Sequence, residues 1–439
     1  METTRKQILA GIGTVLLLLL GCLLFLLFRD QRTLKIGIFY GSNWEVPGTM
    51  HYDILDHAIK KYEKEYPGIS VEYEEGIPSE EYSEWLSGRI LEGEEPDVFI
   101  ILDEDFRTLA ETGVLEPLDY LMQMDTEDKE TEGSGFYGSA LQAGIYKDRQ
   151  YALPFECNPT LMFVNKTLLK QEGIEMPDDD WTWDDFYEIC RRTVKDTDGD
   201  GQIDQFGYYG YTWEHAVYSN GIAPFNADGT DSSLDDGRFA EAMRFVRRLN
   251  DTCQNFQVSA NDFDLGRVVF RPLTFSDYRT YMPYPWRIKK YSDFEWTCIP
   301  MPAGPSGDNT SSMETLLMGM SARTTKKRES WEFLKMLTMD EEIQELIYKD
   351  ASGASALKNV TTSPEMMEFL NKDTPGESDI DLSLLDDTIE KAVPSQAFRA
   401  WQEAEERMDH VLTELMVSDE DISTVLLNLT REIDELIQK

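Results

Sequence analysis

The sharpest local motif in the sequence is the acidic stretch DTDGDGQID, which begins at residue 196. Oxygen-bearing side chains alternate along it, with a glycine at position six and an isoleucine at position eight, as in a calcium-binding EF-hand loop. Position twelve is Gly207, where such a loop requires a bidentate glutamate. The spacing is therefore compatible with a structural calcium site or with an empty acidic turn. The candidate ligands are Asp196, Asp198, Asp200, Gln202 and Asp204.

A second group of polar side chains follows predicted strands. The apolar run from Val98 to Leu102 is typical of a parallel strand buried on both faces, and Asp103 and Glu104 come directly after it. Trp44 and Asp277 also follow predicted strands. Because ligands of open α/β sheets bind outside the carboxyl ends of the strands, we expect these four side chains to line a crevice.

Enzyme motifs are absent from the sequence. It contains no GxSxG, no HExxH, and no Gly-Lys pair from which a phosphate-binding loop could be built. The four histidines are scattered at spacings that suggest no metal pair. Paired carboxylates for glycoside hydrolysis carry no information in a chain with 83 acidic residues, because some pair will always lie close together. We expect no enzyme, and no cofactor beyond calcium.

Composition bounds the remaining classes. The 439 residues are enough for two or three compact units, and a formal net charge of -42 argues against a nucleic-acid partner, which needs Lys and Arg to displace counterions. The four cysteines beyond the N-terminal segment match neither a zinc pattern nor CxxC, which favours isolated thiols and leaves disulfide pairing open.

The N-terminal segment predicts export. Ile8 to Phe28 is continuously apolar or small, is flanked by basic residues and is long enough to span a bilayer as a helix. An uncleaved membrane anchor is one interpretation. The other is a lipoprotein, because Leu19-Leu20-Gly21-Cys22 resembles a lipobox in which Cys22 would be lipidated after cleavage.

The rest of the chain alternates strands and helices. A strand over 34–40, a helix over 55–66, a strand over 69–73 and the strand at Val98 follow one another, which predicts an α/β sheet wrapped by helices. Thr182 followed by Asp185 indicates a helix start of the capping-box type. Two amphipathic helices, around 404–415 and 422–436, end the chain, and their apolar stripes predict packing on a lobe.

Three motifs in this order carry a resemblance: AIKKYEKEYPGISVEYEEGIP, then GEEPDVFIILDEDFRTLAETGVLEPLD, then YALPFECNPTLMFVNK. Together they resemble the extracellular solute-binding proteins, family 1, that capture sugars for bacterial ABC importers, and the likeness covers nearly everything after residue 33. It implies a two-lobed, type II periplasmic-binding-protein-like fold with crossing hinge segments and C-terminal helices. The implied division is an anchor or signal segment (1–33), lobe 1 (34–154 plus 275–322) and lobe 2 (155–274 plus 323–439).

The resemblance also implies a sugar site between the lobes. Aromatic faces and planar side chains that bond hydroxyls in pairs suit such a ligand. Glu156 and Asn158 lie where the chain crosses between lobes in the family, Tyr278 follows Asp277, and Trp213 and Glu314 are carried over from the family pattern. With the strand-end residues, the candidate set is Trp44, Asp103, Glu104, Glu156, Asn158, Trp213, Asp277, Tyr278 and Glu314.

These inferences predict a monomeric receptor on the outer face of a bacterial, Gram-positive cell. It would capture a sugar or oligosaccharide by hinge closure, deliver it to ABC permease subunits, and carry out no covalent chemistry. The alternatives are a glycan-processing hydrolase and an extracellular ligand-sensing module.

Overall fold

The computed structural model describes residues 32–44, 51–128, 135–226, 229–253, 258–280, 294–371, 381–395, 398 and 400–438. The predicted N-terminal membrane segment and Cys22 lie outside these ranges. Across the described ranges, no helix is both long enough and apolar enough to cross a bilayer.

One mixed sheet runs through the molecule. Its strands follow the order β2-β1-β3-β10-β6-β8-β7, and three further strands pair along β6 and β10. The bounds are β1 (Thr33–Gly37), β2 (Ser70–Tyr73), β3 (Val98–Ile101), β6 (Ala152–Asn165), β7 (Phe206–Tyr208), β8 (Val268–Thr274), β9 (Trp296–Ile299), β10 (Ser312–Met320), β11 (Ala354–Ser355) and β12 (Val393–Pro394). A separate hairpin joins β4 (Ile145–Tyr146) to β5 (Arg149–Gln150).

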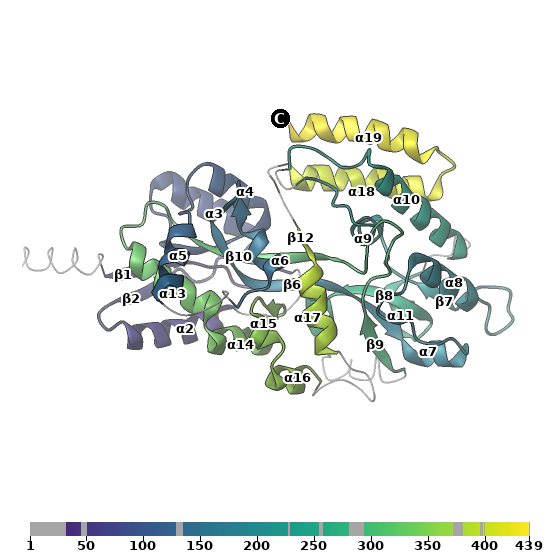
Figure 1. Cartoon of the computed structure of the whole chain (residues 1–439), viewed down its shortest axis with the longest axis horizontal. Helices are drawn as coiled ribbons and strands as arrows, with labels where there is room; N and C mark the ends of the chain where they lie inside the picture. Colours follow the sequence, from purple (N-terminus) through teal and green to yellow (C-terminus); the bar gives the residue numbers. More distant parts are fainter. Residues whose placement is uncertain are drawn as a thin grey trace, which may run out of the picture.

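Strand β6 links the two ends of this sheet. Its first half, from Ala152 to Pro159, pairs antiparallel with β10, and its second half, from Thr160 to Asn165, pairs with β8 and β9. All of its residues are buried, as expected for a strand covered on both faces. Figure 1 shows β6 and β10 passing between the two halves of the molecule.

The first half is a sheet wrapped by helices, as the alternating pattern predicts. Strands β1 and β2 pair in parallel, and β1 pairs in parallel with β3. One hydrophobic core contains residues of these strands and of the surrounding helices. The helices of this half are α2 (His51–Glu65), α3 (Ser79–Glu92), α4 (Asp103–Glu111), α5 (Asp119–Asp128), α13 (Lys327–Met339) and α14 (Glu341–Asp350).

The packing of α13 and α14 differs from the predicted lobe division, which places residues 323–439 in lobe 2. Trp331, Leu334 and Ile343 are buried in the same core as β1 and β3. The physical reason is the course of β10, which pairs with β3 and delivers the chain to the first half just before α13 begins. The other predicted lobe boundaries stay predictions.

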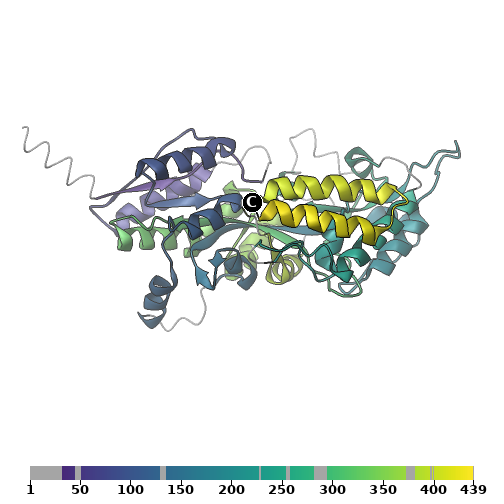
Figure 2. The same ribbon diagram turned by 90° about the horizontal axis from the view of Figure 1, so that it is seen from above.

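The second half has its own core, which takes in the C-terminal helices. Figures 1 and 2 show α18 and α19 side by side as a pair of helices over this half. The helices of this core are α7 (Lys166–Gln171), α8 (Trp183–Thr193), α9 (Trp213–Ser219), α10 (Gly237–Asn250), α18 (Trp401–Val417) and α19 (Ile422–Ile437).

A third hydrophobic cluster lies beside the crossing strands. It includes residues of β6, β8 and β9 together with six short helices. These are α6 (Gly138–Ala143), α11 (Ala260–Asp264), α12 (Phe275–Thr280), α15 (Lys358–Thr361), α16 (Pro364–Asn371) and α17 (Leu382–Lys391).

Several local predictions are confirmed. The Thr182 hydroxyl accepts from the Asp185 N–H, and the Asp185 carboxylate accepts from the Thr182 N–H at 2.8 Å, which is the reciprocal pattern of a capping box. The four described cysteines, Cys157, Cys190, Cys253 and Cys298, are buried, and none of them is in a disulfide.

Candidate functional site

The chain crossings meet at Asn158, in the middle of β6. Its amide nitrogen donates to a Glu314 carboxylate oxygen at 2.9 Å, across the ladder from β6 to β10. Its amide oxygen accepts from the Ser276 N–H at 2.9 Å, at the start of α12. Asn158 is 2% exposed. One buried side chain thus ties together three segments that pass between the halves.

A cavity of about 480 Å³ opens beside this junction. It takes side chains from both halves: α4 contributes from the first, and α9 and α18 from the second. Strand β10 and the residue that directly follows β12 supply its remaining wall. The lining residues are Asp103, Glu104, Glu214, Tyr218, Ser312, Glu314, Ser395, Trp401, Gln402 and Glu405.

Helix geometry explains why these side chains converge. Asp103 and Glu104 form the first turn of α4, which begins directly after β3 and its cap residue Leu102, and carboxylates are favourable at a helix N-terminus. Glu214 and Tyr218 are four residues apart on α9, and Trp401 and Glu405 are four apart on α18. Residues at this spacing share one helix face, so each helix turns a pair of them toward the cavity.

The cavity holds its carboxyls close together and partly away from water. Burial, with Glu314 and Glu104 beside it, raises the pKa of Asp103 well above its usual range. Burial, followed by the negative charges of Glu405, Asp409 and Glu314, raises the pKa of Glu214 to about 7. Burial also raises the pKa of Glu405, against a hydrogen bond from Trp401 that stabilises its carboxylate. Perturbed groups of this kind gather at functional sites.

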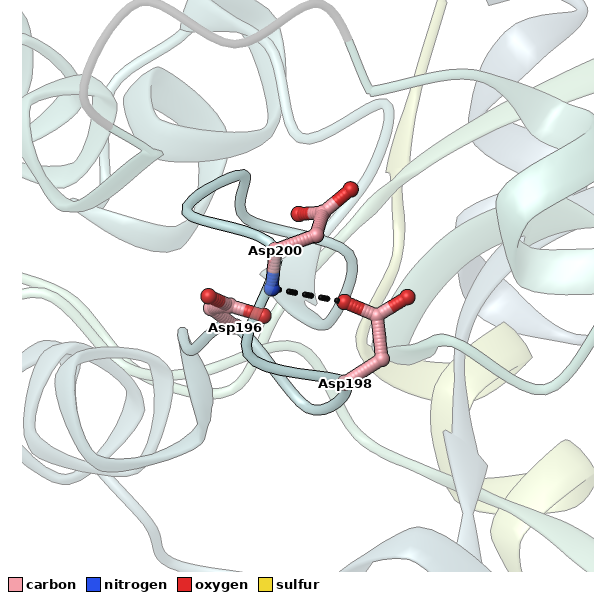
Figure 3. Close-up of side chains that lie close together, drawn as sticks. All are labelled: Asp196, Asp198 and Asp200. Atoms are coloured by element: carbon pink, nitrogen blue, oxygen red, sulfur yellow. Dashed lines mark hydrogen bonds between the residues drawn. The ribbon is translucent and has the colours of Figure 1, made fainter.

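The acidic loop lies apart from this cavity, between α8 and β7. One oxygen of each of Asp196, Asp198 and Asp200 lies within 4.8 Å of the other two. Figure 3 shows these side chains on the loop, with the Asp200 N–H donating to the Asp198 carboxylate. Asp196 accepts from the N–H groups of Gly199 at 2.6 Å and Gly201 at 2.7 Å, so the loop is shaped by its own backbone.

Two further positions of the calcium motif, Asp204 and Gly207, do not face a common ligand site. The Asp204 carboxylate accepts from the Thr197 N–H at 2.8 Å and from the Thr197 hydroxyl at 2.6 Å, so it is bound to the loop itself. Gly207, at position twelve, lies inside β7, where an added Cβ would come within 2.4 Å of Cys190 Cα. Close packing on α8 therefore excludes the glutamate that an EF-hand loop needs at this position.

Comparison with known proteins identifies the chain. The family model described as bacterial extracellular solute-binding protein matches residues 49–343. The chain belongs to this family. Solved structures similar to this solute-binding protein include an ABC substrate-binding protein from Listeria monocytogenes in complex with cycloalternan, at 19% identity and a TM-score of 0.64, covering 92% of this chain and 98% of that one. The sugar-binding protein MalE from Xanthomonas citri matches at 15% identity and a TM-score of 0.73, covering 92% and 97%.

A third similar structure is UspC from M. tuberculosis, at 15% identity and a TM-score of 0.74, covering 92% of this chain and 100% of that one. At these identities the likeness concerns the fold. The predicted class is confirmed: the solute-binding protein has the mixed α/β, type II periplasmic-binding-protein-like fold.

The structure brings three of the predicted ligand-binding residues into the cavity. These are Asp103, Glu104 and Glu314. The side-chain amide of Asn158 donates a hydrogen bond to the Glu314 carboxylate. Asp103 and Glu104 were found because they follow a strand, although they lie in the first turn of α4 and not in a loop before it.

The other predicted residues lie outside the cavity lining. Trp44 is buried in the first core, and Tyr278 in the third cluster, against Phe163 and Trp296. Glu156 is fully buried and accepts from the Gly353 N–H. The remaining two have other partners: Trp213 is buried and donates to Asp409 on α18 at 3.2 Å, and Asp277 accepts from the Thr274 N–H at 3.4 Å.

The sequence analysis did not identify the cavity residues that the second half of the molecule contributes. Glu214 stands next to the chosen Trp213 in the first turn of α9. Glu214 lines the cavity, whereas Trp213 is buried in the core of the second half. Tyr218 and the residues of α18 lie far along the chain from α4. The pairing of an aromatic with a carboxyl four residues later, as in Trp401 and Glu405, was the available signal. The missed residues are Glu214, Tyr218, Ser312, Ser395, Trp401, Gln402 and Glu405.

We predict that Glu214 lowers stability at neutral pH. Its folded-state pKa of about 7 lies above that of an exposed glutamate, so the folded protein binds more protons than the unfolded chain between about pH 4.3 and about pH 7. The contribution of this group to the free energy of unfolding therefore falls as pH rises through that window. Glu214→Gln should be more stable than the parent by about 2 kcal/mol near pH 8, with the difference vanishing near pH 4.5.

Denaturant unfolding at several pH values measures this difference. Glu403→Gln is the matched control, because Glu403 is exposed on α18 and outside the cavity. A stability difference for Glu214→Gln that does not change with pH would show that Glu214 titrates normally.

Proposed function

We propose that this protein is an extracellular receptor that binds a sugar or oligosaccharide in the cavity between its halves and delivers it to an ABC permease. The observation that carries the proposal is the composition of the cavity. It combines the aromatic side chains of Trp401 and Tyr218 with hydroxyl, amide and carboxyl groups. Aromatic faces bind the C–H surfaces of sugar rings and the polar groups bind hydroxyls, which is the combination that a sugar site needs.

The family and its fold support this proposal. Solute-binding proteins with this fold in other bacteria include one solved with cycloalternan and one named as sugar-binding. The cavity volume of about 480 Å³ falls within the range of small-molecule sites. Closure of the halves about the crossing strands would bury the ligand and present a changed surface to permease subunits. The receptor would act as a monomer and without covalent chemistry.

Attachment to the outer face of the membrane completes the proposal. The apolar segment from Ile8 to Phe28 would either span the bilayer or be cleaved before a lipidated Cys22. The two forms differ by the mass of residues 1–21 and of a lipid, so the intact mass of protein extracted from membranes distinguishes them.

We predict that neutral oligosaccharides raise the melting temperature of residues 33–439. A ligand at 100 times its dissociation constant adds about 2.7 kcal/mol of stability. Trp401→Ala should weaken sugar binding by about tenfold or more, because it removes the larger aromatic face. Calorimetric titration with the best sugar from a thermal-shift panel measures both effects.

Two further variants make this test specific. Trp401 also packs on Phe225 and Phe398, with ring centroids 5.3 and 5.6 Å away, so its loss could disturb the fold. Gln402→Ala removes an exposed cavity amide and should weaken binding by about threefold to tenfold. Glu403→Gln should bind normally. Conversion of the sugar to products would contradict a receptor and favour a hydrolase.

For the acidic loop we propose weak structural calcium binding by Asp196, Asp198 and Asp200, with Gln202 and Asp204 as the outer candidates. Without a glutamate at position twelve, the dissociation constant should lie at the weak end, about 10⁻⁴ to 10⁻³ M. Calcium added to chelator-treated protein should give binding heat that Asp200→Asn reduces and Asp235→Asn does not. Asp235 is an exposed acid outside the loop. No heat from the parent protein would remove the site.

A further inference from the structure

Arg107 carries a contact from the first half of the molecule to the second. It lies on α4, whose residues Phe106 and Leu109 are buried in the core of the first half. Its guanidinium carbon is 5.8 Å from the ring centroid of Phe398, which is buried in the core of the second half. A guanidinium that lies over an aromatic ring within about 6 Å is attracted to it. Because the two partners belong to different halves, this contact forms only when the halves approach each other.

Gly229 packs against the same guanidinium from the second half. A Cβ added at this glycine would lie 2.3 Å from Arg107 Nη1 and 2.6 Å from Phe398 Cδ1, so there is no room for a methyl group. The segment that carries Gly229 is fixed to the second half, because the Ser232 hydroxyl donates to the Asp434 carboxylate of α19 at 2.8 Å. The guanidinium therefore meets a formed surface and not a loose loop.

Phe398 connects this contact to the cavity. Its ring packs against Phe225 and Trp401, with ring centroids 4.9 and 5.6 Å away, and its carbonyl accepts from the Trp401 N–H at 2.7 Å. Trp401 lines the cavity. On α4, Arg107 follows the cavity residue Asp103 by four positions, and residues at that spacing share a helix face. The contact is thus one helical turn from the cavity rim.

We propose that Arg107 is a positioning residue that stabilises the closed form of the receptor. On closure, its guanidinium packs on Phe398 and Gly229 and so fixes Trp401 relative to the first half. Arg107 is not part of the cavity lining, so it acts on affinity through the position of the halves and not through contact with the sugar. The inference rests on the proposed function, because it names a residue that controls closure of the same cavity.

A contact of this kind changes affinity through the population of the closed form. When a sugar is held in the closed form, its apparent dissociation constant rises as the closed fraction falls. Loss of the contact lets the cavity open sooner, which raises the dissociation rate of the sugar more than it lowers the association rate. One guanidinium on one aromatic ring accounts for a change of about threefold to tenfold.

The test measures the distance between the halves and the affinity for sugar in the full chain in detergent micelles. Ser87 on α3 and Ser423 on α19 are exposed, and each is replaced by a non-natural residue that carries one dye of a single-molecule energy-transfer pair. The sugar is the tightest-binding member of a panel of neutral gluco-, galacto- and manno-oligosaccharides. Arg107→Ala should shorten the dwell time of the closed form and raise the dissociation constant, each by about threefold to tenfold.

Further variants separate this contact from other effects. Gly229→Ala should reproduce the effect of Arg107→Ala from the opposite half, because its Cβ occupies the space of the guanidinium. Gly173→Ala is the matched control: Gly173 also has a positive φ, of 65°, but nothing lies within 4 Å of an added Cβ, so only backbone strain is introduced. Arg192→Ala removes an exposed arginine of α8 and should change neither quantity.

The combination of Arg107→Ala with Gly229→Ala should be no weaker in binding than the worse single variant, because both remove the same contact. If Arg107→Ala weakens binding while the dwell time of the closed form is unchanged, the positioning role is wrong and the receptor function stands. No change in either quantity also overturns the inference. If no sugar binds the parent protein but Arg107→Ala still shortens the closed dwell time, the sugar function fails and the positioning role stands.

Discussion

The structure depends on one long strand that belongs to both halves of the molecule. Strand β6 gives its first half to β10 and its second half to β8 and β9, and all fourteen of its residues are buried. Asn158, near the centre of β6, forms hydrogen bonds to the Glu314 carboxylate and to the backbone N–H of Ser276. Any rotation of one half against the other must therefore occur around this buried ladder. The cavity lies where the two halves diverge from this ladder, so a rotation of the halves would change its width.

This constraint also explains the electrostatics of the cavity. Helix α4 begins where β3 ends, which brings Asp103 and Glu104 to the cavity rim, and Glu314 stands on β10 beside them. Helices α9 and α18 bring Glu214 and Glu405 from the opposite half. Each carboxyl is placed by its own element, and the repulsion acts within each half as well as across the cavity. Glu104 acts on Asp103 along α4, whereas Glu314 on β10 acts on both Asp103 and Glu214. Functional sites commonly retain such unfavourable local arrangements, which ligand binding then relieves.

The local part of this structure could be predicted from sequence. Unbroken apolar runs such as Val98 to Leu102, the capping box at Thr182 and the helical spacing of the C-terminal apolar residues all depend on neighbours within a few positions. The rule that ligands gather at strand ends predicts that Asp103 and Glu104 line a crevice, and both line the cavity. The same rule placed Trp44 there as well, whereas its large apolar ring is buried in the first core.

What could not be predicted depends on contacts between distant segments. Helix α18 buries Ala404, Met408 and Leu412, as its apolar stripe indicates. Its Trp401 and Glu405 are cavity residues only because α18 packs beside α9, some two hundred positions earlier in the chain. Likewise, Gly207 breaks the calcium motif for a reason that lies in α8, where Cys190 leaves no room for a side chain.

The most direct test of the central claim is a crystal structure of residues 33–439 with a bound sugar. The account predicts that the sugar lies between the halves, with a ring on the face of Trp401 and polar contacts to Asp103 or Glu314. It also predicts that β6 and β10 keep their pairing while the two halves approach each other. A sugar bound elsewhere, or a cavity that stays empty at saturating sugar, would contradict the assignment of this cavity as the ligand site.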